Sequence, residues 1–300
     1  MTKQTAKVLA MNLTSHTRIK LLFCILFFSM SKLTAQVKNA KVDTVFFDDF
    51  SGKILDRTKW NVEISGNTYN NEQQAYVDSD ATIFFSSGPE AAGAHNGALI
   101  VKGLYQGGYV SKEGKSYDFL SGRMNTRGKV EFVNGTAAAR IKLTEGQGLW
   151  PAFWALGAGR WPDTGEIDIM EYVGEHDWTS VALHGPGYSG NTPLVSKAYF
   201  KPNLDVTQWH VYSVDWTQES LVFKFDGNIT YTATRAMIEK YGRWAFDNPK
   251  FLILNLALGG GYPFGINKVA TPYNGIPTST VEIIKKGEAK MIVDWVVITK

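Results

Sequence analysis

Three carboxylates stand close together in one short stretch of the sequence: Glu166, Asp168 and Glu171. The stretch is rich in isoleucine and valine and follows Pro162 and Gly165, a composition that predicts a β-strand. In a helix, Glu166 and Glu171 would lie roughly 140° apart, on different faces. In a strand, Glu166 and Asp168 share a face because side chains alternate with a period of two.

Unbroken alternation would turn Glu171 to the opposite, buried face of this strand, and burying an unpaired glutamate is costly. One extra residue, a β-bulge near Ile169 and Met170, returns Glu171 to the polar face. The sequence therefore predicts a bulged strand that presents three acids on one open face.

Two carboxyl groups about 5–5.5 Å apart are what a retaining glycosidase needs, one as nucleophile and one as general acid/base. A third acid between them, Asp168, would help to keep the acid protonated through its like charge. Spacing alone leaves open a solvated acidic strand face or a cation site. Three tryptophans nearby favour sugar stacking, although each would also suit an ordinary β core; they are Trp150, Trp154 and Trp161.

The segment 166–171 matches the E-x-D-x-x-E signature of glycoside hydrolase family 16. With Gly-Leu-Trp-Pro-Ala-Phe-Trp before it (148–154) and Leu-His-Gly-Pro-Gly-Tyr-Ser-Gly after it (183–190), the chain resembles the laminarinase branch of the endo-β-1,3-glucanases. The resemblance extends from about Phe46 to the C-terminus.

The resemblance implies a role for each candidate residue. Glu166 is expected to be the nucleophile, Glu171 the general acid/base, and Asp168 the residue that tunes them. Such a double-displacement hydrolysis needs no cofactor. The residues expected to bind sugar, by stacking or through hydroxyl groups, are Trp150, Trp154, Trp161, Asn71, Arg123 and His184.

A structural metal is a further expectation. Asp49 near the start and Asp294 near the end are more often surface charges, but hard cations take carboxylate and carbonyl oxygens. The resemblance implies a structural Ca²⁺ held by the carbonyls of Asp49 and Gly97 and by the side chain of Asp294. Such an ion would tie the two chain ends together without joining the chemistry.

Residues 1–35 have the features of a secretory signal peptide, with five basic residues, no acid, and an apolar run of ten residues at 21–30. A retained membrane anchor, or a true start at Met11, are the alternatives. The only cysteine, Cys24, lies in this run, so the mature chain would have neither disulfides nor a thiol nucleophile. Without the five basic residues the formal net charge falls from +3 to −2, which argues against nucleic-acid binding.

Residues 36–300 are expected to form one all-β catalytic domain, because short strand-like runs alternate with turns throughout. Asp226-Gly227 predicts a hairpin turn, 234–241 is the only helix expected, and 84–96 is expected to be a flexible loop beside the site. The resemblance implies a β-jelly-roll sandwich of two antiparallel sheets with a concave substrate cleft. The predicted strands are 44–50, 98–102, 129–132, 137–143, 210–215, 221–225, 251–256 and 290–298.

The function predicted from these features is a secreted or periplasmic, monomeric, endo-acting retaining glycosidase that cleaves laminarin-type β-1,3-glucan. Mixed-linkage β-glucan, an algal galactan (agar or carrageenan type) and transglycosylation stay open as alternatives within the same chemistry. A non-catalytic β-glucan-binding protein on the same fold is the alternative from another class, and it would be expected to lack a catalytic glutamate. The expected partner is a polysaccharide, with no nucleic acid and, after signal cleavage, no membrane.

Overall fold

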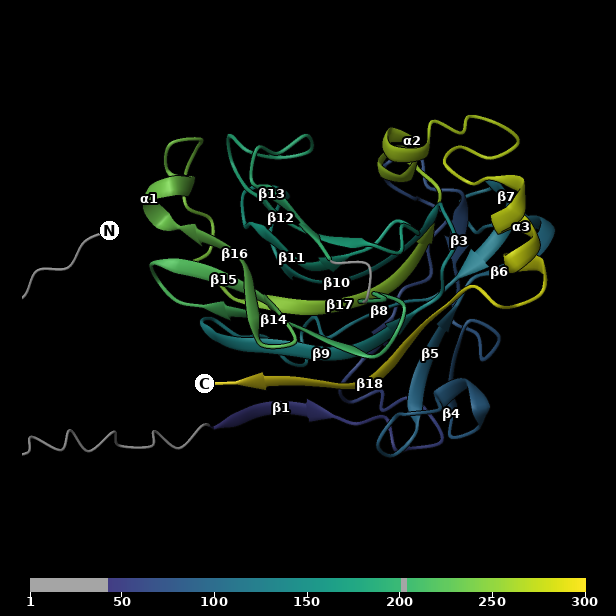
Figure 1. The fold of residues 1–300 in the computed structure, drawn as a ribbon, viewed down its shortest axis with the longest axis horizontal. Helices are drawn as coiled ribbons and strands as arrows, with labels where there is room; N and C mark the ends of the chain where they lie inside the picture. The colour runs from purple at the N-terminus through teal and green to yellow at the C-terminus, as the bar shows by residue number, and fades with distance from the viewer. Residues whose placement is uncertain (1–42, 201–203) are drawn as a thin grey trace, which may run out of the picture. The chain divides into compact units, whose positions relative to one another are not determined.

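Two antiparallel β-sheets make up most of the structure, a computed structural model that describes residues 43–200 and 204–300 (Figure 1). The described residues belong to one compact unit, Val42–Lys300. The predicted signal peptide, 1–35, lies outside the described residues. Among the residues described, none of the helices is both long and apolar enough to cross a membrane.

The larger sheet has eight strands, and its order shows the crossovers of a jelly roll. β9 lies between β14 and β18, which are distant from it in sequence, and β1 pairs with β18 near the C-terminus. In order across the sheet, the strands are β16 (Asn228–Thr234), β15 (Ser220–Phe225), β14 (His210–Trp216), β9 (Gly135–Leu143), β18 (Lys290–Thr299), β5 (Ala98–Lys102) and β4 (Ile83–Ser86), with β1 (Thr44–Asp48) also beside β18.

The second sheet has seven strands and lies over the first in Figure 1. One face of this sheet packs in the core against the larger sheet, and the opposite face, called the open face, carries the alternate side chains of its strands. In order across it, the strands are β13 (Val195–Tyr199), β12 (Trp178–His184), β11 (Glu166–Glu171), β10 (Leu149–Gly157), β17 (Lys250–Leu258), β8 (Arg123–Asn125) and β2 (Asn61–Val62).

The core lies between these two sheets and follows from the alternation of apolar residues. In β15, for example, Leu221, Phe223 and Phe225 are buried while Lys224 points outward. Removing such side chains from water is the main stabilising contribution, at about 25 cal/mol per Å² of apolar surface. The predicted all-β jelly-roll sandwich is therefore confirmed.

A small third sheet and three α-helices complete the fold. The third sheet contains β3 (Gln74–Tyr76), β7 (Ser116–Ser121) and β6 (Leu104–Val110), and β3 pairs with β7 in parallel. The helices are α1 (Arg235–Ile238), α2 (Gly261–Asn267) and α3 (Thr278–Lys285), together with a short 3-10 turn, Pro89–Ala91.

Several local predictions can be compared with these elements. The hairpin at Asp226-Gly227 is confirmed, with positive φ at both residues. The helix predicted at 234–241 is present as the shorter α1, but α2 and α3 show that it is not the only one.

Two predictions of local structure were wrong. Residues 129–132 form a turn that ends in a single bridge from Phe132 to Lys250, because the chain reverses there between β8 and β9. Residues 84–96 do not border the open face of the seven-stranded sheet. They contain most of β4 and the 3-10 turn at the edge of the eight-stranded sheet, where Phe84 and Ala91 pack in a small apolar cluster.

Candidate active site

The three predicted acids lie on β11, and a bulge interrupts this strand between them. Where β10 pairs with β11, Phe153 lies opposite Met170, and the next residue, Trp154, lies opposite Asp168. Ile169 is therefore the extra residue, and the register with β12 shifts over the same stretch. The predicted bulge is confirmed.

The bulge divides the side chains of β11 between the core and the open face. Ile167, Ile169 and Met170 are at most 2% exposed and pack in the main core. Glu166 and Glu171 are half-buried. A strand without the bulge would have placed the second glutamate among those apolar side chains, at the cost of an unpaired buried charge.

Each glutamate accepts a hydrogen bond from an indole. Trp161 Nε1 donates to Glu166 Oε2 at 2.7 Å, and Trp150 Nε1 donates to Glu171 Oε1 at 3.0 Å. The ring of Trp161 is 47% exposed, so it remains available to a ligand while its N–H orients the carboxylate. Two of the three predicted tryptophans thus contact the acids directly.

Asp168, between the two glutamates, is 5% exposed and lacks a full set of hydrogen-bond partners. His184 Nε2 lies 3.3 Å from Asp168 Oδ2, but this oxygen has no partner with hydrogen-bond geometry, and neither has His184 Nδ1. The two residues come from adjacent strands, and His184 lies opposite Glu166 in the β11–β12 register. The predicted histidine therefore lies within the acid cluster.

Burial dominates the electrostatics of the cluster. It raises the pKa of Glu166 and of Glu171 to about 8, and that of Asp168 to about 7. Asp168 raises the pKa of both glutamates further by like charge, whereas His184 and the indole donors lower them. Interacting carboxyl groups titrate as a unit, so the cluster holds at least one proton near neutral pH.

The third tryptophan belongs to a polar network on the neighbouring strands. Trp154 Nε1 donates to Asn255 Oδ1 at 2.8 Å, and the guanidinium of Arg123 lies 4.9 Å from the centre of the Trp154 ring. Arg123 Nε also lies 2.9 Å from a carboxylate oxygen of Glu63. Because Arg123 pairs with Asn255, which pairs with Ala152 on β10, the network extends from the acids toward β8.

Sequence reasoning missed the buried part of this network. Asn255 Nδ2 donates to the hydroxyl of Tyr76, which donates to Glu72 Oε2 at 3.3 Å, and Gln74 donates to the same oxygen at 2.8 Å. Burial raises the pKa of Glu72. Glu72, Gln74 and Tyr76 all belong to the amide-rich stretch that contains Asn71, so the stretch itself was the available signal.

Asn71 is exposed and has a left-handed backbone conformation, φ 57°. Its loop lies against the start of α2, where Gly261 N donates to Asn70 O at 2.6 Å. The structure does not bring the Asn71 side chain into hydrogen-bond contact with the acids. Its predicted role in sugar binding stays a prediction.

Tyr262, at the start of α2, connects this helix to the open face of the sheet. Its hydroxyl lies 2.9 Å from Ser180 Oγ, and its ring meets that of Trp150 edge to face at 5.5 Å. Because Trp150 also binds Glu171, α2 contacts the acid cluster through this aromatic pair. Figure 1 shows α2 beyond the end of the seven-stranded sheet.

The residues predicted to hold calcium belong to the eight-stranded sheet and the segments next to it, and the segment 95–97 connects two of them. Asn96 donates to the Asp49 carboxylate at 3.0 Å, and His95 N donates to Asp294 Oδ1 at 2.9 Å. The oxygen donors suit a hard cation, but Arg140 already binds Asp294 Oδ2. The set thus fits calcium only weakly, and calcium stays a prediction.

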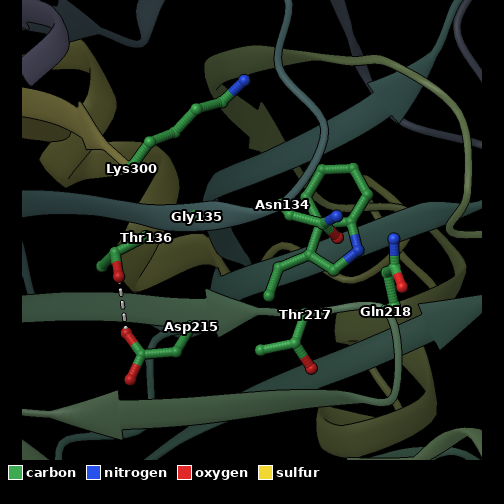
Figure 2. Close-up of a pocket in the computed structure, with 8 residues that line it drawn as sticks. Asn134, Gly135, Thr136, Asp215, Thr217, Gln218 and Lys300 are labelled. Carbon is green, nitrogen blue, oxygen red and sulfur yellow. Dashed lines mark hydrogen bonds between the residues drawn. The ribbon is translucent and has the colours of Figure 1, made fainter. Parts of the chain in front are cut away.

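A second group of possible metal ligands coincides with the acids themselves. Ligand atoms of Glu166, Asp168 and His184 all lie within 4.8 Å of one another, and no other such group is found in 43–200 and 204–300. A cavity of about 440 Å³, drawn in Figure 2, lies instead at the ends of β9 and β14. Its one acid, Asp215, is already bound by Thr136 and Lys224, so this cavity offers no comparable chemistry.

An all-β sandwich whose open face carries a buried aspartate between two half-buried glutamates oriented by tryptophans has the features of a jelly-roll glycoside hydrolase. Comparison with known proteins agrees, because residues 92–270 match the family described as Glycosyl hydrolases family 16. The match covers more than half of the chain, and the chain belongs to this family.

Individual relatives support the assignment. The chain is 31% identical to Beta-glucanase from Rhodothermus marinus over 225 residues, which cover 71% of this chain and 74% of that protein. The laminarinase catalytic domain from Thermotoga maritima matches with a TM-score of 0.71 and 29% identity over 86% of this chain and 98% of its own. The endo-β-1,3-glucanase from Pyrococcus furiosus matches with a TM-score of 0.72 and 29% identity, over 86% of this chain and 94% of its own.

Relatives with other names show how much the family membership leaves open. Keratan-sulfate endo-1,4-beta-galactosidase from Sphingobacterium multivorum is 27% identical over 262 residues, which cover 82% of this chain and 57% of that protein. The protein is therefore a family 16 glycosidase similar to laminarinases, and the polysaccharide it cleaves has to be argued from its site.

Proposed function

We propose that the protein is an endo-acting, retaining β-1,3-glucanase of the laminarinase type. The observation that carries this proposal is the arrangement on β11: two glutamates, each bound by an indole N–H, flank a buried aspartate on one open face. This supplies the two carboxyl groups of a double displacement and, in Asp168, a like charge that favours a protonated general acid.

In the first step, the Glu166 carboxylate attacks the anomeric carbon while protonated Glu171 gives its proton to the departing glycosidic oxygen. The glycosidic bond breaks and a glycosyl ester forms on Glu166. In the second step, Glu171 takes a proton from water, and the resulting hydroxide attacks the anomeric carbon and releases Glu166. The configuration is inverted twice and so retained.

Asp168 raises the pKa of both glutamates by like charge. The pKa of Glu171 is raised by burial and then by both Asp168 and Glu166, so this glutamate faces two neighbouring acids. Once Glu166 is consumed as an ester, it no longer carries a charge. The pKa of Glu171 then falls, and Glu171 becomes the base that the second step needs.

Neutral β-glucan is the substrate that the surroundings of the acids support. Arg123, two strands beyond β10 on the same sheet, already contacts Glu63 and the Trp154 ring, so it is suited to a sugar hydroxyl rather than to a free sulfate. The laminarinases and the β-glucanase named above add support. Mixed-linkage β-glucan and the galactans are the alternative outcomes of the test below.

A non-catalytic glucan binder would not need this geometry. It has no use for two glutamates held in orientation by indole donors, nor for an aspartate buried between them without a full set of partners. Two other parts of the proposal rest on the sequence alone: export guided by residues 1–35, and action as a monomer with no cofactor in catalysis.

The test is the product profile of purified residues 36–300 on laminarin, mixed-linkage glucan, agarose and carrageenan. Oligosaccharides from laminarin, with or without products from mixed-linkage glucan, are expected. Cleavage of only a galactan would keep the acids but overturn the substrate. The absence of products from all four polysaccharides would overturn the enzyme assignment.

A further inference from the structure

Four side chains extend the open face of the seven-stranded sheet beyond β11. Ser180 lies opposite Glu171 in the β11–β12 register, and Lys197 lies opposite Ser180 in the β12–β13 register. Two pairs further along, and so on the same face, Trp178 lies opposite Tyr199. Directly opposed residues of antiparallel strands share a face, so these four side chains stand on the same face as Glu171.

Contacts between these residues support the placement. Lys197 Nζ lies 3.9 Å from the centre of the Trp178 ring, and the rings of Trp178 and Tyr199 are 6.3 Å apart and tilted by 46°. Trp178 is 5% exposed beneath this cover, whereas Tyr199 is 68% exposed on the edge strand. Packing therefore explains Trp178 but leaves the exposed Tyr199, two strands from the acids, unexplained.

A second element of the fold borders the same area. Tyr262 of α2 lies 2.9 Å from Ser180 Oγ and packs edge to face on Trp150, which binds Glu171. Burial chiefly raises the pKa of the Tyr262 hydroxyl, and the charge of Glu171 raises it further. The exposed ring of Tyr199 therefore lies on the same face of the sheet as Glu171, the proposed general acid/base.

The strand order places this surface on the side of the acids opposite to Arg123. β11 has β12 and β13 on one side and β10, β17, β8 and β2 on the other. Arg123 of β8 and Trp154 of β10 belong to the latter side, and Tyr199 of β13 belongs to the former. A glucan that crosses the sheet over the acids meets both.

We propose that Tyr199, Lys197 and Ser180 form a sugar-binding subsite for the leaving-group side of the cleaved bond. The exposed face of Tyr199 stacks on a glucose ring, and Lys197 and Ser180 bind its hydroxyl groups. This inference rests on the proposed function, because it takes Glu171, which lies opposite Ser180, as the group that protonates the leaving sugar.

The charge of Lys197 does not call for an anionic sugar. Its ammonium group lies over the Trp178 ring, and Glu175 is close enough to raise the Lys197 pKa, which burial lowers. The Trp178 ring and the Glu175 carboxylate therefore already stabilise the positive charge of Lys197, so no anionic sugar is needed for that. The ammonium keeps three N–H donors, which suit the hydroxyl groups of a neutral hexose.

Two substrates separate the two sides of the acids. Laminarihexaose has sugars on both sides of the cleaved bond, whereas an aryl β-laminaribioside carries its sugars only on the glycosyl side. For Tyr199→Ala in residues 36–300, kcat/KM on the hexaose is expected to fall about tenfold, mainly through KM. The value for the aryl glycoside is expected to fall much less. Lys197→Met is expected to lower kcat/KM on the hexaose about threefold and to lower the value for the aryl glycoside much less.

Two further variants control for structure. Tyr199→Phe keeps the ring and is expected to restore most of the loss on the hexaose. Tyr105→Ala removes another partly exposed tyrosine with a neighbouring lysine, but on the small third sheet, and is expected to change neither rate. An equal fall on both substrates, or no fall on the hexaose, would overturn the subsite.

Failure of the proposed function is visible separately. Wild-type hydrolysis of both laminari-substrates tests the glucanase, and the ratio between variant and wild type tests the subsite. If the wild type cleaves another polysaccharide instead, the hexamer and the aryl glycoside of that polymer replace the two substrates. The same split is then expected, and its absence overturns the subsite.

Discussion

Two buried aspartates, one on each main sheet, show opposite solutions to the same problem. Asp294 is fully buried on β18, and its carboxylate is bound by His95 N at 2.9 Å, by His95 Nδ1 at 2.5 Å and by Arg140. Asp168 is 5% exposed on β11, yet its Oδ2 has no hydrogen-bond partner and its neighbours in sequence include two more acids. The Asp294 carboxylate has hydrogen bonds and an opposite charge beside it, whereas one oxygen of the Asp168 carboxylate has no hydrogen-bond partner.

The difference separates a structural group from a chemical one. Removing a charge from water is tolerated when hydrogen bonds and an opposite charge replace the water, as they do at Asp294. A buried acid that lacks such partners lowers stability, and such acids gather where a shifted pKa is needed. The core between the sheets offsets this cost, and the acid cluster on β11 receives the protonation states that glycoside hydrolysis requires.

The largest expected effect is the loss of either glutamate. Glu166→Ala removes the nucleophile, and Glu171→Ala removes the proton donor, whose contribution is about 10²–10⁴-fold. We expect each variant to lower kcat on laminarin by about 10³-fold or more, with an unchanged circular dichroism spectrum. Near-normal turnover in either variant would show that its role is wrongly assigned.

Exchanging each aspartate for asparagine tests the comparison directly. Asp168→Asn is expected to lower kcat about 10–100-fold and to leave the free energy of unfolding unchanged or higher, because it removes an uncompensated buried charge. Kinetics on laminarin and thermal unfolding of the same preparation give both values. A stability loss with normal kcat would make Asp168 structural.

The matched variant on the other sheet should behave in the opposite way. Asp294→Asn leaves Arg140 with a neutral partner in a buried site, and breaking a buried pair costs about 3–5 kcal/mol. We expect the melting temperature to fall by several degrees while kcat at 25 °C stays near the wild-type value. An equal loss of activity in the remaining folded protein would remove the distinction between the two aspartates.

The pH dependence follows from the raised pKa values of the cluster. The pKa values of Glu166 and Glu171 are near 8 in the folded state, above those of the unfolded chain, so the folded state binds more protons between about pH 4 and 8. The contribution of these groups to stability is therefore present at acid pH and declines as the pH rises through this range.

The pH dependence of activity should reflect the protonation of the same two glutamates. We expect kcat/KM on laminarin to decline above about pH 8, where Glu171 loses its proton. Asp168→Asn removes the like charge and is expected to shift this decline to lower pH. A shift to higher pH would contradict the role given to Asp168.

Chelation should have the smallest effect. If calcium is held by Asp49, Gly97 and Asp294, EDTA is expected to lower the melting temperature by a few degrees and to leave the rate at 25 °C unchanged, because these residues are not part of the seven-stranded sheet that carries the acids. No shift in melting temperature would remove calcium from the account.

The acid strand was predictable because its rules are local. Period-two alternation and the cost of burying Glu171 were enough to predict the bulge between Asp168 and Glu171. The hairpin at Asp226-Gly227 was predictable for the same reason, because the turn dictates its residues.

The partners of the acid strand were harder to predict because they come from distant segments. Asn255 binds Trp154 across two strands that are about a hundred residues apart in sequence, and Tyr76 reaches Asn255 from the third sheet. Consecutive glycines at the start of α2 argue against a helix on local preference alone. In the structure, Gly260 and Gly261 pack against the 70–72 loop, and this contact holds the start of the helix in place. Tertiary contacts, rather than local preferences, place these residues.

The stereochemistry of hydrolysis tests the central claim most directly. Proton NMR of laminarihexaose cleavage by residues 36–300 records the anomer of the first-formed product before mutarotation. The pair Glu166 and Glu171, acting by double displacement, predicts that the β-anomer appears first. First appearance of the α-anomer would mean a single displacement by water, and would contradict the nucleophilic role of Glu166.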